Sequence, residues 1–238
     1  DIYSVQKTLK SDYLATGPKI KEYESKLSQY LNSKYSSSCS SGTAGLHLAF
    51  LAAGIKKNDV VILPIINFIS ASNILHSIGA DIYFCDVEKY NGLISSRTIK
   101  ECIKKNKLKN IKAIVNCHIS GDASNIVEIF KLKKKKKFLL IDDACHALGS
   151  AYKFNKKIYK VGCSKHCDIS VFSTHAIKTI TTGEGGFVTT NNKIFFSKIE
   201  KLKSHGIVRG KFHYKYDIIY PGFNYRLSDI NATLGIAQ

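Results

Sequence analysis

The 238-residue chain contains no methionine, and its first residue is Asp1. It stops at Gln238 inside an apolar, helix-like pattern, with no terminating glycine or polar tail. We therefore expect a fragment that is truncated at its C-terminus and at its N-terminus. No internal repeat or low-complexity linker interrupts the chain, and 44% hydrophobic residues suffice for a full α/β core. These features predict one domain over residues 1–238.

Long apolar runs are also missing, so the sequence shows neither a membrane span nor a signal peptide. The seven cysteines lie mostly within apolar strand or helix patterns, which fits a reducing compartment. Cys163, His166 and Cys167 form a small cluster, but it lacks the second ligand pair that a structural zinc site requires. We expect a cytoplasmic protein that binds no membrane and no metal.

Acidic residues are scarce, with 18 Asp and Glu against 36 Lys and Arg, for a formal net charge of +18. Such a charge would attract nucleic acid. However, the excess is nearly all lysine spread over predicted helix surfaces, and no recognised binding module or aromatic interleaving accompanies it. The densest run, residues 133–137, falls where a helix should end before a strand, and cations there complement the helix dipole. We therefore expect no nucleic-acid partner. A basic nucleic-acid-binding protein is the less favoured alternative.

Apolar strand patterns alternate along the chain with segments long enough for crossover helices. This alternation predicts an α/β fold with a mainly parallel sheet and helices on both faces. A hairpin-like segment at residues 186–190 adds a strand that could be antiparallel. A helix should begin with Pro18 at its first position, after an extended segment. The expected parallel strands are residues 60–63, 81–87, 112–118, 138–142 and 169–173.

A lysine framed by small residues and glycines stands out in the stretch 172–186 (FSTHAIKTITTGEGG). Residues 168–173 read as a buried strand, and the glycines at 183–186 allow the backbone to turn closely behind the lysine. Lys178 is therefore expected at the mouth of a strand. That setting suits an amine that forms a Schiff base with a cofactor.

A second apolar strand, in residues 138–146 (FLLIDDACH), ends in two carboxylates and a histidine. The carboxyl ends of parallel strands are where α/β sheets place ligands. Adjacent strand residues face opposite sides of a sheet, so at most one of Asp142 and Asp143 can face a ligand there. A carboxylate beside a pyridine nitrogen would keep that nitrogen protonated and electron-withdrawing.

A third motif, residues 40–45 (SSGTAG), runs directly into an apolar helix expected at residues 46–53. The backbone N–H groups of Gly42, Thr43 and Ala44 at such a helix start can hold a phosphate. Taken alone, the serine-rich run at residues 36–43 would favour an ordinary flexible loop. Together with the lysine and the aspartate, however, it describes the protein side of a pyridoxal phosphate (PLP) site.

The order of phosphate helix, aspartate and lysine resembles the fold-type I aminotransferases. Nearly the whole chain resembles the DegT/DnrJ/EryC1/StrS sugar aminotransferase family. The resemblance implies that residues 1–238 are the PLP-binding large domain, that a smaller C-terminal domain is absent here, and that the active site is shared between the subunits of a homodimer.

The resemblance also assigns roles to single residues. Lys178 would form the Schiff base and transfer a proton, and Asp143 would face the ring nitrogen. Lys178 argues for transamination, because some relatives carry histidine there and act as sugar dehydratases. The remaining cofactor contacts that the resemblance implies are the backbone at Gly42, Thr43 and Ala44, the stacking ring of Phe68, His146, Ser173 for the phosphate, and Asn224 from a second subunit.

The resemblance extends to the substrates. Thr16 and Gly17 would lie over the active site, and Arg226 would contact a pyrophosphate. The branch that the sequence resembles most aminates C4 of a UDP-linked 4-keto-6-deoxy-N-acetylhexosamine on the route to pseudaminic acid, with glutamate as the expected donor. Gly121 matches the family, but Asp122 replaces an uncharged residue. A non-catalytic regulatory protein on the same fold remains an alternative.

Overall fold

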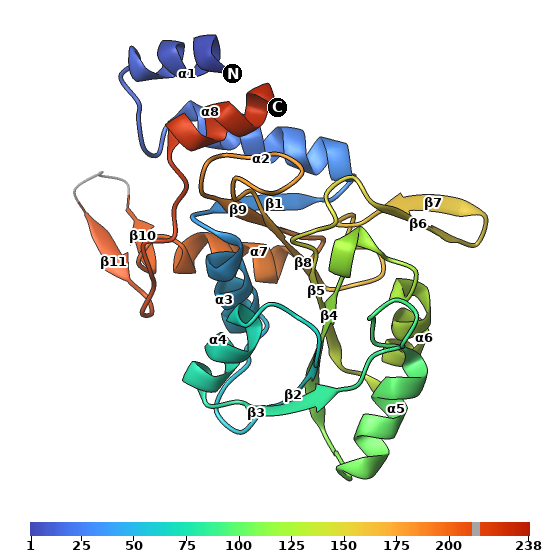
Figure 1. The fold of residues 1–238 in the computed structure, drawn as a ribbon. Coiled ribbons are helices and arrows are strands. Elements are labelled where there is room, and N and C mark those ends of the chain that lie inside the picture. Colours follow the sequence, from blue (N-terminus) through green and yellow to red (C-terminus); the bar gives the residue numbers. More distant parts are fainter. Residues whose placement is uncertain (211–214) are drawn as a thin grey trace.

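The computed structural model describes residues 1–210 and 215–238, in which a seven-stranded mixed sheet carries helices on both faces (Figure 1). The strand order is β1-β9-β8-β5-β4-β2-β3. These strands are β1 (Tyr35–Cys39), β2 (Val60–Pro64), β3 (Asp81–Cys85), β4 (Ile111–Cys117), β5 (Leu139–Asp143), β8 (Ile169–Ser173) and β9 (Gly186–Thr190).

The pairing of these strands confirms the expected mainly parallel sheet. Strands β3, β2, β4, β5 and β8 pair in parallel, whereas β9 runs antiparallel to both β8 and β1. All five apolar segments predicted as parallel strands form strands, with bounds that differ by at most two residues. The antiparallel strand after the lysine is also confirmed.

The helices are α1 (Ile2–Leu9), α2 (Pro18–Leu31), α3 (Gly42–Ala52), α4 (Ser70–Ile78), α5 (Ser96–Lys105), α6 (Ile126–Lys136), α7 (Lys193–Leu202) and α8 (Asp229–Ala237). Alternate residues of a strand serve separate cores on the two faces of the sheet. In β4, Ala113 and Val115 join a core with α3, α4 and α7, and Ile114 joins another with α5 and α6. A third core packs α2 and α8 near β8 and β9.

Two predicted helix ends are confirmed. Helix α2 begins with Pro18 at its first position, and α6 ends within the lysine run at Lys136, where the C-cap residue Lys137 has a φ of 57°. The helix expected at residues 46–53 instead begins at Gly42, because the Ser41 hydroxyl accepts the Ala44 N–H at 3.0 Å and caps the helix.

The segment before Pro18 departs from the prediction of extended chain, because residues 2–9 form α1. The only buried residue of this helix is Thr8, whose hydroxyl lies 2.8 Å from that of Thr233 in α8. Helix α1 therefore lacks the buried apolar stripe that would have marked it in the sequence. Figure 1 shows α1 and α8 side by side.

The serine-rich run contains strand β1 rather than a flexible loop. Its serines are buried, and two of the three hydroxyls have charged partners: Ser38 donates to Glu24 at 2.8 Å, and Ser37 lies 2.9 Å from Lys203 Nζ, whereas the Ser36 hydroxyl has no hydrogen-bond partner. Since such a strand replaces apolar side chains with paired polar ones, its sequence lacks the usual alternation. Two short hairpins were not predicted either: β6 (Ala151–Phe154) with β7 (Lys157–Lys160), and β10 (Ile207–Arg209) with β11 (Tyr216–Ile218).

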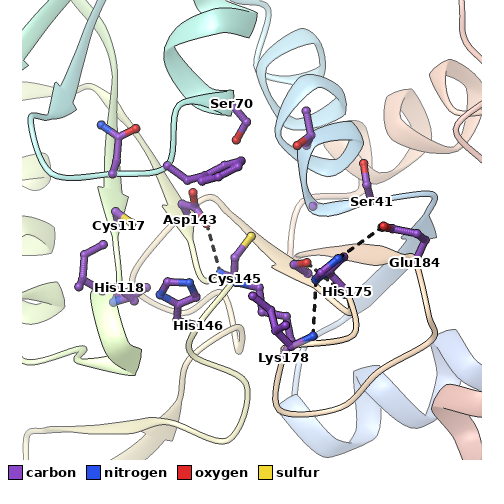
Figure 2. A pocket seen from close by; sticks show the side chains of 17 residues that line it. Ser41, Ser70, Cys117, His118, Asp143, Cys145, His146, His175, Lys178 and Glu184 are labelled. Atoms are coloured by element: carbon purple, nitrogen blue, oxygen red, sulfur yellow. Dashed lines mark hydrogen bonds and ion pairs between the residues drawn. The ribbon is translucent and has the colours of Figure 1, made fainter.

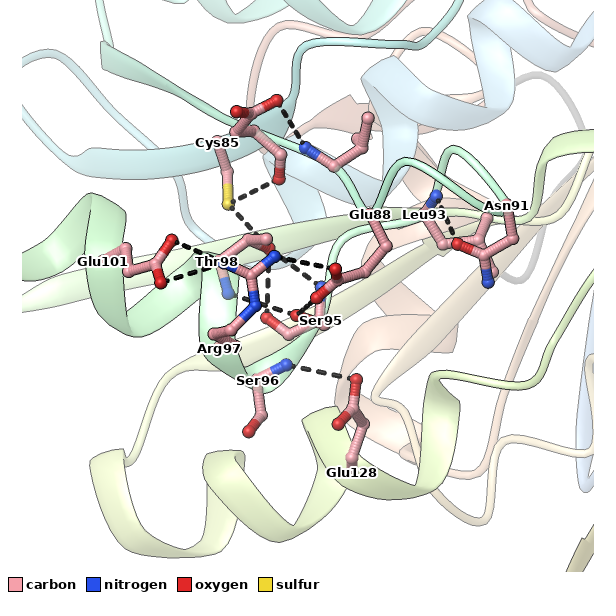
Figure 3. A network of polar contacts seen from close by, with 12 residues as sticks. Cys85, Glu88, Asn91, Leu93, Ser95, Ser96, Arg97, Thr98, Glu101 and Glu128 are labelled. Carbon is pink, nitrogen blue, oxygen red and sulfur yellow. Dashed lines mark hydrogen bonds and ion pairs between the residues drawn. The ribbon is translucent and has the colours of Figure 1, made fainter.

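The chain leaves β3 at Cys85, two residues earlier than predicted, and enters a polar network (Figure 3). Arg97 contacts Glu88 at 2.7 Å and Glu101 at 2.9 Å, while Ser95 and Thr98 form a capping box at the start of α5. These contacts fix the β3–α5 turn at the carboxyl edge of the sheet. Within residues 1–210 and 215–238, none of the helices combines the length and the apolar character needed to cross a bilayer.

Candidate functional site

A cavity of about 550 Å³ opens at the carboxyl ends of β4, β5 and β8 (Figure 2). It is the place where a parallel sheet is expected to hold a ligand. Lys178 and Asp143 both line it, although Asp143 ends strand β5 and Lys178 lies on the loop after β8. The full lining is Ser41, Gly42, Thr43, Asn67, Phe68, Ser70, Cys117, His118, Ile119, Asp143, Cys145, His146, Ser173, His175, Ile177, Lys178 and Glu184.

Of the two adjacent carboxylates at the end of β5, one faces the cavity and the other does not, as the alternation of strand side chains between the two faces of a sheet requires. Asp143 lines the cavity, is 4% exposed, and its Oδ1 accepts the Cys145 N–H at 3.2 Å. Asp142 is fully buried outside the lining, where Asn116 Nδ2 lies 3.3 Å from its Oδ1. Asp143 thus offers a nearly desolvated negative charge to the cavity.

Lys178 sits on the loop at residues 174–185, between β8 and β9. The loop is closed at its base: Thr174 N–H donates to Gly185 O at 2.9 Å, and Thr182 N–H donates to Thr174 O at 2.9 Å. Asn231 of α8 donates from Nδ2 to Thr182 O at 2.5 Å. The backbone N–H of Lys178 donates to His175 O at 2.9 Å. These contacts hold the lysine loop against the sheet and α8.

The start of α3 forms one end of the cavity. Gly42 and Thr43 are in the lining, but the Ala44 N–H already donates to the Ser41 hydroxyl and Ala44 is buried outside it. A β-carbon on Gly42 would lie 3.0 Å from both Cys145 Sγ and the Ser173 β-carbon, so a glycine permits this close packing. Of the three backbone donors expected for a phosphate, two therefore border the cavity.

Three further predicted residues, Phe68, His146 and Ser173, also line the cavity. Phe68 is 70% exposed, so its ring is not part of the apolar core. A large aromatic face that packs against little protein is available to stack on a ligand ring.

The structure does not bring the four remaining predicted residues into the cavity lining. The Gly17 N–H donates to Asp229 Oδ2 at 2.5 Å, and the preceding Thr16 is exposed. Asn224 is exposed and Arg226 Nη1 lies 3.4 Å from the Ser204 hydroxyl. Their proposed contacts with substrate or with a second subunit stay predictions.

Several lining residues were missed by the sequence reasoning. His118 and Cys117 end a parallel strand, so the rule that found Asp143 could also have found them. His175 and Glu184, whose side chains lie 3.6 Å apart, face each other across the lysine loop (Figure 2). Cys145 lies within the aspartate motif itself.

The ionisable groups around Asp143 respond to its burial and charge. Burial raises the pKa of Cys145 well above its usual range, and the Asp143 carboxylate raises it further. Burial and Asp143 raise the pKa of Cys117 as well. Both thiols therefore stay protonated at neutral pH and act as small apolar walls.

Asp122, which was noted in the sequence because it replaces an uncharged residue, makes local structural contacts. Gly121 has a φ of 82°, and a β-carbon there would lie 2.8 Å from the Ser150 hydroxyl. Asp122 then accepts the Ser124 N–H at 2.8 Å through Oδ1, while its backbone carbonyl lies 3.1 Å from His118 Nδ1. Asp122 does not line the cavity.

The cysteine–histidine cluster is organised by protein contacts. His166 Nδ1 lies 2.7 Å from the Tyr152 hydroxyl, and Cys167 Sγ lies 3.1 Å from the Ser170 hydroxyl. Cys163 Sγ lies 3.6 Å from the same tyrosine hydroxyl. Across the residues described, no group of three or more His, Cys, Asp or Glu side chains is arranged to hold a metal ion.

Known proteins are similar to this chain in both sequence and fold. UDP-4-amino-4,6-dideoxy-N-acetyl-beta-L-altrosamine transaminase of Campylobacter jejuni subsp. jejuni serotype O:23/36 (strain 81-176) is 41% identical over 238 residues, which are 100% of this chain and 61% of that protein. The chain thus spans 61% of the length of this curated relative.

Two solved structures agree. Helicobacter pylori PseC, an aminotransferase involved in the biosynthesis of pseudoaminic acid, matches with a TM-score of 0.88 and 30% identity, over 100% of this chain and 61% of that one. The PLP form of the putative sugar aminotransferase Spr1654 from Streptococcus pneumoniae matches with a TM-score of 0.87 and 27% identity, over 99% and 62%. The DegT/DnrJ/EryC1/StrS aminotransferase family matches residues 1–238, and the chain belongs to that family.

Proposed function

We propose that this chain is the cofactor-binding large domain of a PLP-dependent aminotransferase that moves an amino group from glutamate to a keto-sugar nucleotide. The observation that carries the proposal is the shared cavity: Lys178, Asp143 and the start of α3 come from three distant segments and line one space. Membership of an aminotransferase family supports the same reaction class.

The residues present fit pyridoxal phosphate. The nearly buried Asp143 carboxylate suits a protonated ring nitrogen, and the close packing at Gly42 leaves the start of α3 open to the cavity. A helix N-terminus suits a phosphate dianion, and Thr43 and Ser173 add hydroxyl groups beside it. When bound, this cofactor supplies an electron sink for negative charge on the amino donor.

The residues of the chain then have separate tasks. Lys178 would hold the cofactor through Nζ, and the freed amine could take a proton from Cα of the donor. Asp143 would orient the ring, Phe68 would cover one face of it, and His146 would support its edge. Each of these side chains borders the cavity.

For the substrate, we infer a UDP-linked 4-keto-6-deoxy-N-acetylhexosamine aminated at C4, in the pathway to pseudaminic acid. The names of the Campylobacter and Helicobacter relatives support this choice. Thr16, Gly17 and Arg226 would contact the nucleotide sugar. The enzyme would act in the cytoplasm.

We further infer a homodimer in which Asn224 reaches the partner's cofactor phosphate. Asn224 is exposed and lies outside the cavity of its own subunit. Beside the cavity, residues 65–69 expose apolar side chains, with Ile65 54%, Phe68 70% and Ile69 60% exposed. An apolar patch of this kind is typical of a surface that another chain covers.

The test uses the complete gene product. Purified with PLP, it should show the visible absorbance of a lysine-bound cofactor, and glutamate should convert this band to that of the aminated cofactor. Lys178→Ala should abolish the band, and Lys165→Ala, on an exposed surface, should retain it. A panel of keto-sugar nucleotides should then yield an amino sugar.

Two results would contradict the proposal. If no cofactor binds, the chain has no PLP function. If the cofactor binds but glutamate never changes the spectrum, a non-catalytic regulatory protein replaces the transaminase.

A further inference from the structure

Behind Asp143, the side chains of His118 and Asp142 form a fully buried pair. His118 Nε2 lies 3.5 Å from Asp142 Oδ2, and both side chains are 0% exposed. The neighbouring strands set this contact: His118 follows β4, and Asp142 lies on β5 beside it, where Asn116 is opposite Asp142 and Cys117 is opposite Asp143. His118 also lines the cavity (Figure 2). The pair thus adjoins the cavity through its histidine.

The contacts of His118 favour its doubly protonated form. Nδ1 lies 3.1 Å from the Asp122 carbonyl oxygen, which can only accept, so Nδ1 carries a proton. Nε2 lies 3.5 Å from Asp142 Oδ2, which is buried and has no hydrogen-bond partner. Nε2 also lies 3.4 Å from Asn116 Nδ2, but that amide already donates to Asp142 Oδ1 at 3.3 Å. A second proton on Nε2 would satisfy Oδ2, which is costly to leave without a donor.

The surrounding charges act in the same direction. Burial alone would lower the pKa of His118, but the Asp142 carboxylate raises it more, with smaller contributions from the Asp122 carbonyl and from Asp143, and the pKa lies above its usual value. Asn116 supplies only a neutral amide to Asp142, and Asn125 fixes that amide by donating to its oxygen at 2.8 Å. Among the described residues, His118 is the one cationic group that contacts Asp142 at ion-pair distance.

This arrangement bears on Asp143 because two adjacent carboxylates disfavour each other's charge. Without compensation, Asp142 would promote protonation of Asp143, and a protonated carboxyl could not support a protonated pyridine nitrogen. We propose that His118 is a positioning residue of the cofactor site: its imidazolium neutralises Asp142, so that Asp143 presents a full negative charge to the ring nitrogen of bound PLP. This proposal rests on the function proposed above.

The experiment compares two probes that differ only at the ring nitrogen. Dissociation constants of PLP and of its analogue with C–H in place of that nitrogen are measured by equilibrium dialysis against the complete gene product. The ratio of the two constants reports the charge at Asp143, whereas a general loosening of the fold would weaken both probes alike.

We expect the wild-type protein to prefer PLP. His118→Gln should reduce this preference about tenfold or more, since the uncompensated charge of Asp142 would then oppose the negative charge that holds the protonated ring nitrogen. Removing both charges in the double variant His118→Gln/Asp142→Asn should restore the preference. Asp142→Asn alone should retain it, and so should the control His76→Gln, which changes an exposed histidine of α4.

The outcomes separate the two proposals. If the wild-type protein binds neither probe, the proposed cofactor function fails. If it prefers PLP and His118→Gln retains that preference, or if the double variant does not recover it, the role of His118 is refuted. If His118→Gln does not fold, Asp142→Asn still tests the role of His118. A tenfold loss of the preference for PLP in that variant would contradict charge neutralisation.

Discussion

The hydroxyl oxygens of Thr174 and Thr182 lie 2.7 Å apart and close the base of the loop that carries Lys178. Gly185 packs directly against this contact. A β-carbon on Gly185 would lie 2.2 Å from Thr182 Oγ1 and 2.6 Å from Thr174 Oγ1. The position of Lys178 therefore depends on two threonines and a glycine that do not line the cavity.

The first prediction concerns Gly185→Ala. The added methyl group must displace the paired hydroxyls, so we expect a loss of about 1 to 3 kcal/mol in the free energy of unfolding. Denaturant titration measures it. Thr182→Ala in the same chain should recover part of the loss because it removes the closest oxygen. Gly210→Ala, whose β-carbon would meet no atom nearer than 3.5 Å, should have little effect. Equal losses at both glycines would contradict this explanation.

The second prediction concerns the helix cap at Ser41. Ser41→Ala removes the acceptor of the Ala44 N–H and should cost about 1 kcal/mol of stability. It also frees the Ala44 N–H and removes a hydroxyl from the cavity lining, so the affinity for PLP should change along with the stability. Calorimetric unfolding with and without PLP measures both effects. Ser40→Ala is the control, since it leaves the Ser41 cap intact; an unchanged melting temperature in Ser41→Ala would show that the cap contributes nothing.

The third prediction concerns Phe68, whose exposure makes it dispensable for folding. Phe68→Ala should change the free energy of unfolding without cofactor by less than about 0.5 kcal/mol. It should weaken PLP binding roughly two- to tenfold, because a stacked aromatic pair contributes about 0.5 to 1.5 kcal/mol beyond its buried area. Equilibrium dialysis measures the affinity. Ile69→Ala, which is similarly exposed but does not line the cavity, should leave it unchanged.

The fourth prediction concerns Lys203, which is buried among α2, β1 and α7. Its Nζ contacts Glu24 at 3.0 Å, Glu200 at 2.5 Å and Ser37 at 2.9 Å. Lys203→Met leaves two carboxylates without their partner and should cost about 3 to 5 kcal/mol. Lys201→Met, on the same helix but only partly buried, should cost less than about 1 kcal/mol. Similar losses in the two variants would refute a special role for the buried ion pairs.

The same lysine predicts a dependence on pH. Burial alone would lower the pKa of Lys203, but Glu24 and Glu200 raise it more, and it lies above its usual value. A raised folded-state pKa contributes stability that is fully present below about pH 10.4 and is lost as pH rises through the folded value. Denaturant titrations from pH 8 to 11 should show this loss in the wild-type protein and a shallower one in Lys203→Met.

The sequence predicted the parallel strands well because buried strands are continuous apolar runs, and β8 at residues 169–173 matches its prediction. Strand β1 could not be predicted in this way. The hydroxyls of Ser37 and Ser38 are satisfied in the interior by Glu24, Glu200 and Lys203, and these partners come from other segments of the chain. Helix α1 was missed because its apolar residues Ile2 and Tyr3 remain exposed.

The residues of the site also divide into those that a local sequence pattern predicts and those whose role depends on distant contacts. Lys178, Asp143 and Gly42 follow local patterns at strand ends and at a helix start, so their places were accessible from sequence. His118 was missed because its importance depends on a neighbour across the sheet, Asp142, rather than on its own motif. Thr16 lies outside the cavity because the chain there is tied to Asp229 by the neighbouring Gly17 N–H, a contact that no local pattern reveals.

The edge position of β1 constrains how the protein can mature during synthesis. Within the part of the chain that the structure describes, strand β1 pairs only with β9, and β9 in turn pairs with β8. While the chain emerges from the ribosome, residues 35–39 therefore have no strand to dock on until residues 186–190 have been made. The end of the cavity formed by α3 should consequently assemble only after β9 has been made, and a nascent chain that stalls before Thr190 should be unable to retain PLP.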